Sequence, residues 1–367
     1  MILPGSTLPS LMEHFSLAEF KAGMIGSSFF TGGIFGILAT SLLIAKIGAR
    51  NSLILCNVIT AAGLFLIPLV GNYYFLFSFY FIVGVSFGVI VTLPGVVVNA
   101  LEGLKSASSM NVVYGFFALG VVIEPLAAGW LLEKNFEWWT PYLLPTVFAI
   151  LGALSARQSK SFLEPQMQLQ LSFGVIKKVW RSNPAILVVG VGGTLLYVAS
   201  EVTLNLWIPT FLKSAFPTTV GISQANTVLT LFWVGLTGGR WLGSSVLKKV
   251  EPANFLMILS LLGGVTVAIA PQMKTPILAE GGLVLAGIWY SAIYPTITSY
   301  TGRLEANQAG AVFSIMAGGG QLGAVFFPAF VGGLAQHGKF PLGMSLASVP
   351  LFLMIILVSV FKVKQQI

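Results

Sequence analysis

The stretch Leu119–Gly129, which reads LGVVIEPLAAG, recurs 203 residues later as Leu322–Gly332, which reads LGAVFFPAFVG. The same shift, without a gap, pairs several polar residues whose match is not explained by an apolar composition. These pairs are Ser41 with Ser244, Lys46 with Lys249, Asn51 with Asn254, and Glu102 with Glu305. A constant shift of this kind indicates two copies of one structural unit in the same order along the chain.

The composition is that of a membrane protein. Hydrophobic residues make up 56% of the chain and charged residues 8%, and the mean hydropathy is +0.91. Soluble domains carry about a quarter charged residues. Apolar stretches of about 20 residues, the length of a spanning helix, recur along the chain, without the alternating pattern of membrane β-strands. The sequence therefore predicts an all-α integral membrane protein.

Two hydrophobic halves in the same order are typical of the parallel repeats of secondary transporters, in which solute binds where the repeats meet. We expect an N-terminal helical half over residues 1–156, a cytoplasmic linker over 157–182 and a C-terminal helical half over 183–367. The expected spans are 21–45, 51–70, 73–100, 107–132, 138–156, 184–212, 224–247, 253–271, 277–301, 308–335 and 340–361.

The repeat also predicts that the first helix is largely missing. The shift places Met1 opposite Leu204, well inside the span that begins near Pro184, so about 20 residues of the first half's opening helix have no counterpart here. Residues 1–12 are too short to span and are interpreted as the end of that helix. We therefore expect twelve helices in a complete protein and a native reading frame that extends upstream of Met1.

The basic residues predict the orientation. If residues 1–12 end a helix that runs outward, fourteen Lys and Arg residues fall on the cytoplasmic side and five on the external side. The cytoplasmic set is Lys46, Arg50, Lys105, Arg157, Lys160, Lys177, Lys178, Arg181, Arg240, Lys248, Lys249, Arg303, Lys362 and Lys364, and the external set is Lys21, Lys134, Lys213, Lys274 and Lys339. Retention of basic loops inside the cell explains the net charge of +8 without nucleic-acid binding. The C-terminus is expected in the cytoplasm, with the protein in the cell membrane.

The segment 41–50 resembles a loop signature of the major facilitator superfamily, Gly-x-x-x-Asp-Arg-x-Gly-Arg-Arg. The matching positions are Lys46, Gly48 and Arg50, and the departing positions are Ser41 and Ala45. With the repeat and the basic central loop, the likeness covers essentially the whole chain. It implies a bundle of two parallel six-helix repeats and a gating role for the three matching residues. The missing Asp removes one partner of the ion pair that steadies one conformation in that family.

Within this superfamily, three segments resemble the fucose–galactose–glucose permease branch of sugar:proton symporters. They are Leu196–Glu201 with Trp207, Phe232–Gly235 with Gly239 and Arg240, and Gly287–Tyr290 with Tyr294–Thr296. In that branch, acidic residues of the first and fourth helices contribute to sugar binding and proton coupling. Here the span 73–100 has no acidic residue before Glu102. The resemblance implies sugar transport, but its coupling residues do not carry over directly.

Ionisable residues inside the spans are candidates for solute binding or coupling, because a charge in hydrocarbon costs about 2.5–3.5 kcal/mol on insertion scales. Glu201 and Glu124 each lie about two thirds of the way along a span, where a carboxyl could take up and release a proton. Structural alternatives stay open: Glu201 could bond to a neighbouring helix, and Glu124 could satisfy a carbonyl freed by Pro125. Arg240 is expected to snorkel or to brace a cytoplasmic gate.

Sugars are commonly bound by aromatic rings against their apolar faces and by amides at their hydroxyls. The candidates of this kind toward the interior are Asn111, Tyr114, Asn205, Trp233, Tyr290, Tyr294 and Gln321. No cofactor is predicted, because the glycine runs at 32–33 and 318–320 lack the Gly-Lys-Ser/Thr of a nucleotide-binding loop. One cysteine, Cys56, and two histidines, His14 and His337, do not suggest a metal site.

The sequence therefore predicts a secondary carrier for a small polar solute, working as a monomer in the lipid bilayer by rocking of its halves. The resemblance suggests a sugar as the solute and protons as the coupling ion. Two alternatives stay open: an exporter of organic or amphiphilic compounds, and a non-transporting membrane receptor derived from a carrier. An enzyme is the least favoured class, because no nucleophile–base pair or metal constellation is visible.

The charge bias generates a test of topology. Single cysteines placed at Lys177, Lys134 and Lys274 in a Cys56→Ser background should differ in their reaction with an impermeant thiol reagent added to intact cells. We expect labelling at Lys134 and Lys274 and none at Lys177 until the membrane is permeabilised. Labelling of the Lys177 position from outside would reverse the predicted orientation.

Overall fold

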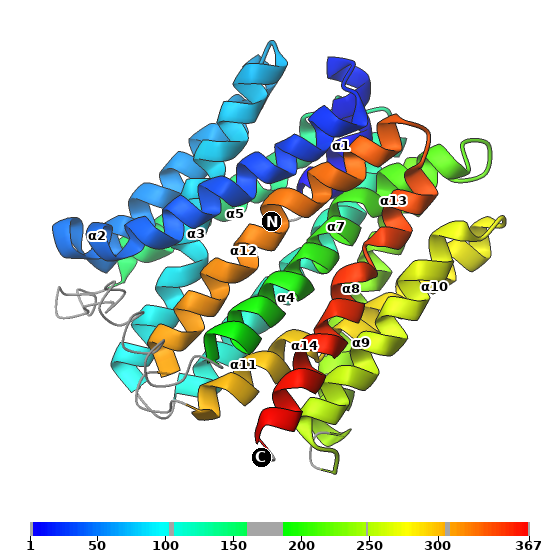
Figure 1. Ribbon diagram of the computed structural model, residues 1–367. Helices are drawn as coiled ribbons and strands as arrows, with labels where there is room; N and C mark the ends of the chain where they lie inside the picture. Colours follow the sequence, from blue (N-terminus) through cyan, green and yellow to red (C-terminus); the bar gives the residue numbers. More distant parts are fainter. Residues whose placement is uncertain (1–2, 103–105, 160–185, 247–248, 305–308, 366–367) are drawn as a thin grey trace.

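The computed structural model describes the chain except for residues 1–2, 103–105, 160–185, 247–248, 305–308 and 366–367. Long helices run side by side through the molecule (Figure 1). They are α1 (Leu3–Phe15), α2 (Glu19–Leu66), α3 (Tyr73–Glu102), α4 (Ser106–Glu133), α5 (Leu143–Gln158), α7 (Gly192–Ala215), α8 (Ile222–Val246), α9 (Pro252–Ile269), α10 (Pro276–Tyr290), α11 (Ile293–Leu304), α12 (Ala309–Gln336), α13 (Phe340–Leu346) and α14 (Val349–Gln365). Short turns of helix join some of them, namely η1 (Ile67–Leu69), η3 (Thr140–Tyr142), η4 (Ile186–Val191) and η5 (Ala270–Gln272).

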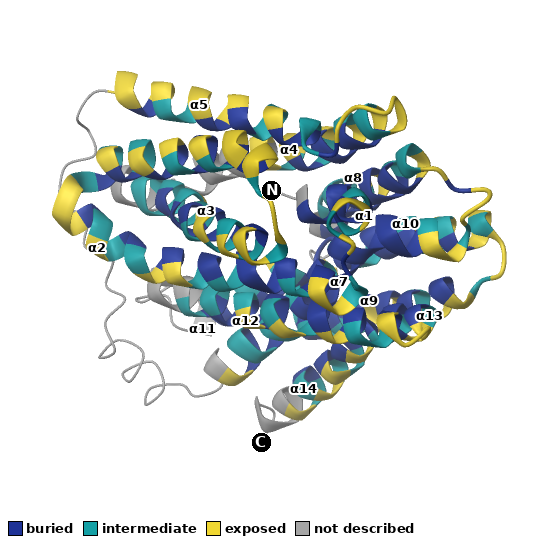
Figure 2. Cartoon of the chain, turned by 90° about the horizontal axis from the view of Figure 1, so that it is seen from above, coloured by how far each residue is buried: buried dark blue, intermediate teal, exposed yellow. Residues whose placement is uncertain are grey.

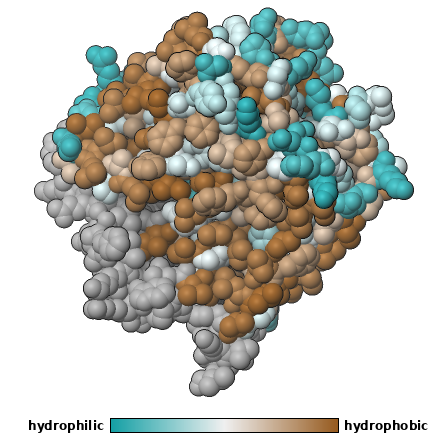
Figure 3. All heavy atoms as spheres, turned by 45° about the horizontal axis from the view of Figure 1, so that its top comes forward, coloured by the Kyte–Doolittle hydropathy of each residue, from teal (hydrophilic) through white to brown (hydrophobic). Residues whose placement is uncertain are grey.

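The described helices confirm an all-α membrane protein. Eight of them are long and apolar enough to cross a membrane. Hydrophobic side chains cover much of the visible surface, while hydrophilic ones gather toward the upper part of the view (Figure 3). We call the end of the bundle where α1 ends and α2 begins, drawn at the top of Figure 1, the upper end. It is the end that the charge bias predicts to be external.

The expected spans 21–45 and 51–70 correspond to the two arms of α2, which meet at Gly48, where φ is 78° and ψ is 161°. A glycine is needed at such a dihedral because side chains disfavour positive φ. The span 277–301 is divided between α10 and α11, and the span 340–361 between α13 and α14.

The expected linker 157–182 lies largely outside the described residues, and α5 extends to Gln158. The division of the chain into halves at this linker therefore stays a prediction. The expected spans 138–156 and 224–247 are helices here, α5 and α8, although neither is among the eight long apolar ones.

The packing of the helices follows the sequence repeat. A Cβ at Gly84 would lie 2.1 Å from the carbonyl oxygen of Phe29, and a Cβ at Gly287 would lie 2.1 Å from that of Phe232. The second pair is the first pair shifted by 203 residues. The contact of α2 with α3 is thus repeated by α8 with α10, and in both places only glycine allows the backbones to approach so closely.

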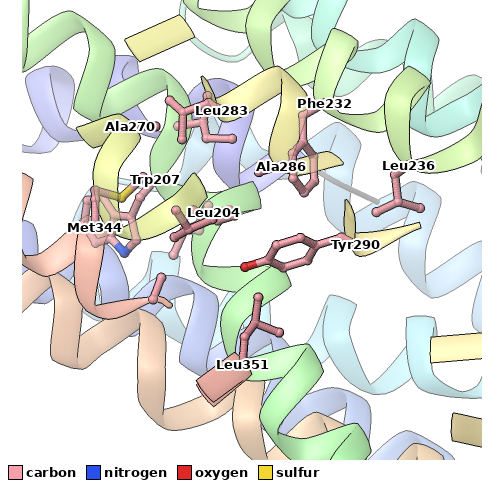
Figure 4. Close-up of a cluster of buried hydrophobic side chains, with 14 of the residues drawn as sticks. Leu204, Trp207, Phe232, Leu236, Ala270, Leu283, Ala286, Tyr290, Met344 and Leu351 are labelled. Carbon is pink, nitrogen blue, oxygen red and sulfur yellow. The ribbon is translucent and has the colours of Figure 1, made fainter. Parts of the chain in front are cut away.

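Two hydrophobic clusters, with a third around Ile44 and Leu93, fill the interior of the described structure. The larger joins α7, α8, α10, α13 and α14, and its Tyr290 lies between Phe232 and Leu351 (Figure 4). The smaller includes Phe29 and Tyr80. Exposed residues face outward on α2, α5 and α14, whereas much of α8 and α10 is buried (Figure 2). The bundle therefore presents apolar side chains outward and close packing inward, as a membrane-embedded protein requires.

The two copies of the repeat meet through α2 with α12, α4 with α8, and α1 with α7. Ser27 on α2 donates a hydrogen bond of 2.5 Å to the carbonyl oxygen of Val325 on α12. Across the other pair, a Cβ at Gly129 on α4 would lie 2.9 Å from the Cβ of Asn226 on α8. These contacts lie toward the upper end, because α2 and α8 begin there and α4 and α12 end there.

The glycine packing predicts a contrast within one helix. Gly287→Ala should lower the stability of the protein by about 1–3 kcal/mol, since the new methyl group would overlap the Phe232 carbonyl. Gly281→Ala is the matched control on α10, because nothing lies within 4 Å of a Cβ there. Thermal unfolding of the two variants in detergent should show a lower melting temperature for Gly287→Ala only. Equal melting temperatures would contradict the close approach of α8 and α10.

Candidate functional site

One face of α7 stands out because it is partly exposed on an otherwise buried helix. Between Tyr197 and Leu212 every residue of α7 is buried except Val198, Glu201 and Asn205. The spacing of these three residues places them on one side of the helix. We call them the α7 stripe. Since α7 packs against α1, α8, α12 and α14, we interpret the stripe as bordering a solvent-accessible space inside the bundle.

Glu201 is the charged member of the stripe. Its carboxyl interacts electrostatically with the guanidinium of Arg240 on α8 and lies beside the hydroxyl of Tyr197, one helical turn earlier. The Tyr197 hydroxyl is buried, and among the described groups none forms a hydrogen bond of normal geometry with it. A carboxylate, a guanidinium and a phenol hydroxyl therefore meet in one place, and all three can bond to a polar ligand.

Tyr197, which lies beside this acid, packs against two further tyrosine rings. The Tyr197 ring centre lies 5.9 Å from that of Tyr290 and 5.8 Å from that of Tyr294. Tyr290 is fully buried, and its hydroxyl and that of Ser200 are 2.5 Å apart in a hydrogen bond. Tyr294 is partly exposed. Of these two nominated tyrosines, Tyr294 is thus the better placed to contact a solute, whereas Tyr290 supports the cluster from the core.

Two of the nominated amides also lie toward the interior. Asn205 accepts a hydrogen bond of 3.2 Å from the indole of Trp233 on α8, so these two candidates meet. Gln321 on α12 is partly exposed, and its side-chain oxygen is buried without a described partner. That oxygen lies 3.8 Å from the position of a Cβ at Gly33, on α2. Gln321 therefore lies where α2 and α12 meet, and its amide oxygen is free to accept a bond.

Glu124 lies in a separate network near the upper end. Its carboxylate accepts a 2.5 Å hydrogen bond from the hydroxyl of Ser6 on α1. The backbone oxygen of Ser6 accepts a 3.2 Å bond from Asn226 on α8. The next residue, Thr7, is 2.8 Å from the hydroxyl of Tyr142, with which it shares a hydrogen bond. These bonds tie α1 to α4, η3 and α8.

The residues of the family signature lie around the bend in α2. Gly48 forms the bend, and the hydroxyl of Ser52 donates a 2.7 Å bond to its carbonyl oxygen. Arg50 donates from Nε to the backbone oxygen of Ala156, at 3.2 Å, and from its guanidinium to that of Arg157. Arg50 thereby holds the last turn of α5 against α2. Lys46 is exposed.

Two nominated residues, Asn111 and Tyr114, belong to α4, but their side chains lie outside the described part of the structure. Conversely, Tyr197, Ser6 and Asn226 were not nominated from the sequence. A signal for Tyr197 was present, because it precedes Glu201 by four residues and so shares its helix face. For the other two, only the folded chain reveals the contact.

Within the described ranges, no group of three His, Cys, Asp or Glu side chains is placed to hold a metal ion.

Long apolar helices in two structurally repeated sets, with polar side chains at their junction, define a multi-pass membrane protein of the transporter type. The chain belongs to the Major Facilitator Superfamily, which it matches over residues 1–304. The expectation drawn from the loop signature and the repeat is thus confirmed.

Three known proteins similar to this chain are named as carriers. A Helicobacter pylori protein, named as a putative glucose/galactose transporter, is 27% identical over 350 residues, which cover 87% of this chain and 82% of the relative. The crystal structure of the nucleoside transporter NupG superimposes with a TM-score of 0.75 at 15% identity, covering 99% of this chain and 93% of that one. The E. coli fucose:proton symporter FucP gives a TM-score of 0.63 at 19% identity, with 98% and 95% covered. At these identities the two structures establish the shared fold.

The Ser6 bond generates a prediction about Glu124. Glu124→Ala should destabilise the protein by about 1–3 kcal/mol, because the buried Ser6 hydroxyl loses its acceptor. Glu124→Gln retains an acceptor oxygen and should keep a melting temperature close to that of the wild type. A Ser6→Ala/Glu124→Ala double variant should lose less than the sum of the two single variants. Additive losses would show that the two side chains do not act together.

Proposed function

We propose that this protein is a secondary carrier that moves a small, polyhydroxylated solute across the membrane by alternating access. The observation that carries the proposal is the α7 stripe, which places Glu201 and Asn205 beside Tyr197, Arg240 and Trp233 on a partly exposed face of a buried helix. In transporters built from repeats, solute sites lie near the middle of the membrane where the repeats meet. Membership of the superfamily supports the same class of function.

The chemistry of the stripe suits a sugar. Aromatic rings can pack on the apolar face of a sugar ring, while carboxylates, amides and phenol hydroxyls bond to its hydroxyl groups. Tyr294 supplies a ring, and Glu201, Asn205 and the Tyr197 hydroxyl supply the polar contacts. The solutes named for the three similar proteins described above are glucose or galactose, fucose and nucleosides. All of these contain a hydroxylated ring, which is the solute class that we propose here.

Glu201 is the residue that we propose for coupling to protons. It is an acid inside a membrane helix, beside a cation and next to a solute-accessible face. A carboxyl in such a place can gain a proton in one conformation and release it in the other. Glu124 is the weaker candidate, because the residue is buried and its carboxylate is bonded to Ser6. Uptake of solute with protons would follow if only the protonated, loaded carrier changes conformation easily.

Alternating access requires the contacts at the upper end to open. The bonds that would break are those between the two copies of the repeat, Ser27 with Val325 and Asn226 with Ser6. The bond of Ser6 with Glu124 lies within the first copy and would move with it. We therefore propose that α1 stays with α4 and α5 when the halves rock apart, and that this upper end is the external one in the cell membrane.

Transport and coupling can be measured together in proteoliposomes. Wild-type protein should exchange labelled galactose, fucose or a nucleoside in counterflow and should accumulate it when an inward proton gradient is imposed. Glu201→Gln should abolish accumulation and retain exchange, because the amide corresponds only to the protonated state. The matched control is Glu280→Gln, since Glu280 is bonded to Gln224 at an exposed position.

The outcomes separate the parts of this proposal. Binding of solute without counterflow would favour a receptor over a carrier. Transport with accumulation retained in Glu201→Gln would assign this acid to structure. Active extrusion of organic cations or amphiphiles, with no exchange of hydroxylated solutes, would favour an exporter.

A further inference from the structure

A proline follows the break between α10 and α11, which carry Tyr290 and Tyr294, two members of the tyrosine cluster that Tyr197 of α7 completes. α10 ends at Tyr290, and α11 begins at Ile293. Four residues after Ser291 comes Pro295, which has no N–H and cannot donate the helical hydrogen bond to the Ser291 carbonyl. The Nε of Arg240, from the neighbouring helix α8, donates to this carbonyl at 3.3 Å. Arg240 thus supplies a bond to the acceptor that Pro295 leaves without a backbone donor.

The first copy of the repeat provides an internal comparison. The shift of 203 residues places Thr92 at the position of Pro295, Gly88 at that of Ser291 and Ile37 at that of Arg240. There α3 continues unbroken from Tyr73 to Glu102. Thr92 has a backbone N–H, and its own hydroxyl also donates to the Gly88 carbonyl at 2.8 Å, so no donor from a neighbouring helix is needed. The proline and the arginine are therefore two differences between the copies that occur together and that compensate each other.

The approach of α8 to this break depends on Gly239. A Cβ at this position would lie 2.4 Å from the hydroxyl oxygen of Ser291 and 3.1 Å from the carbonyl oxygen of Ile288. At Gly238, by contrast, nothing lies within 4 Å of a Cβ. Gly239 therefore brings the backbone of α8 close enough for the next residue, Arg240, to reach the Ser291 carbonyl.

The break lies directly between two members of the tyrosine cluster. Tyr290 ends α10 and Tyr294 lies in the first turn of α11, and both rings adjoin Tyr197 at 5.9 and 5.8 Å. The angle between α10 and α11 consequently decides where these two rings stand relative to Tyr197 and Glu201. In lipid, a broken helix keeps a defined angle only when its freed backbone groups are satisfied.

We infer that Arg240 is a positioning residue: by bonding to the Ser291 carbonyl it sets the break between α10 and α11 and so holds Tyr290 and Tyr294 against Tyr197. This inference rests on the proposed function only in assuming that the tyrosine cluster contacts the solute. It differs from a role for Arg240 as the counter-charge of Glu201, because a new backbone donor at position 295 would replace the positioning bond but not the charge.

A double-mutant cycle distinguishes the two roles. The single variants are Arg240→Leu, Pro295→Thr and Pro295→Ala. The two double variants combine Arg240→Leu with Pro295→Thr or with Pro295→Ala, because either replacement restores the N–H at position 295. Arg240→Leu should lower the melting temperature in detergent by about 2–5 °C, the shift expected for a lost buried bond. The Arg240→Leu/Pro295→Thr variant should recover most of this loss, because a threonine at position 295 would donate to the Ser291 carbonyl as Thr92 donates to that of Gly88 in the first copy.

Solute kinetics test the link to the site. Arg240→Leu should raise the KM for the transported solute about 10-fold, the size expected when one binding contact is misplaced. The double variant should return to within about threefold of the wild-type KM, since the rings regain their place. Gly239→Ala should raise KM as Arg240→Leu does, whereas the matched control Gly238→Ala should not.

The melting cycle needs no solute, so it decides the positioning bond even if transport is not observed. Recovery of the melting temperature in either double variant supports the inference. Failure of both Pro295→Thr and Pro295→Ala to recover it, with Arg240→Lys equal to the wild type in stability and KM, would overturn the inference in favour of a counter-charge. Recovery of stability without recovery of KM would overturn the link between the break and solute binding.

Discussion

A backbone carbonyl inside a lipid bilayer must find a donor within the protein, because no water is there to replace one. Proline removes such donors, and this chain places prolines inside α1, α3, α4, α7 and α12 and directly after the start of α11. Near two of these prolines, Pro328 and Pro295, backbone carbonyls receive bonds from other helices. Ser27 bonds to Val325 and Trp207 to Pro328, both on α12, and Arg240 bonds to Ser291. The arrangement of the interior depends on how these acceptors are satisfied.

Glycine serves the complementary purpose of bringing backbones together. Where two helices in lipid have no hydrophobic driving force to associate, close contact supplies the attraction. Gly84 and Gly287 allow the same contact in each copy of the repeat, and Gly239 brings Arg240 within reach of its acceptor. The same contact network therefore supports both stability and the geometry of the candidate site. The polar residues of that site lie on this frame, not on loops.

The two copies of the repeat have diverged in polarity around the candidate site. The first copy has Ile37, Gly88 and Thr92 where the second has Arg240, Ser291 and Pro295. The continuous helix of the first copy corresponds to a broken helix with a cation beside it in the second. The consequence for the proposed carrier is an asymmetric site, in which the second copy supplies the acid, the cation and most of the rings. The first copy supplies the network of Glu124, Ser6 and Tyr142 that fastens α1.

The sequence by itself determined the membrane class, the repeat and the family. Each of these follows from the amino-acid composition and from residues that recur at a fixed shift, and neither depends on long-range contacts. It also nominated Glu201 and Arg240, since ionisable residues in apolar helices are conspicuous. Which residues meet was decided only by the tertiary structure. Ser6 and Glu124, which share a hydrogen bond, are 118 positions apart. Tyr290 was nominated as a solute contact, but it is fully buried beneath α7 and α14. Pairing across the bundle follows from helix packing angles and backbone breaks, which local sequence does not specify.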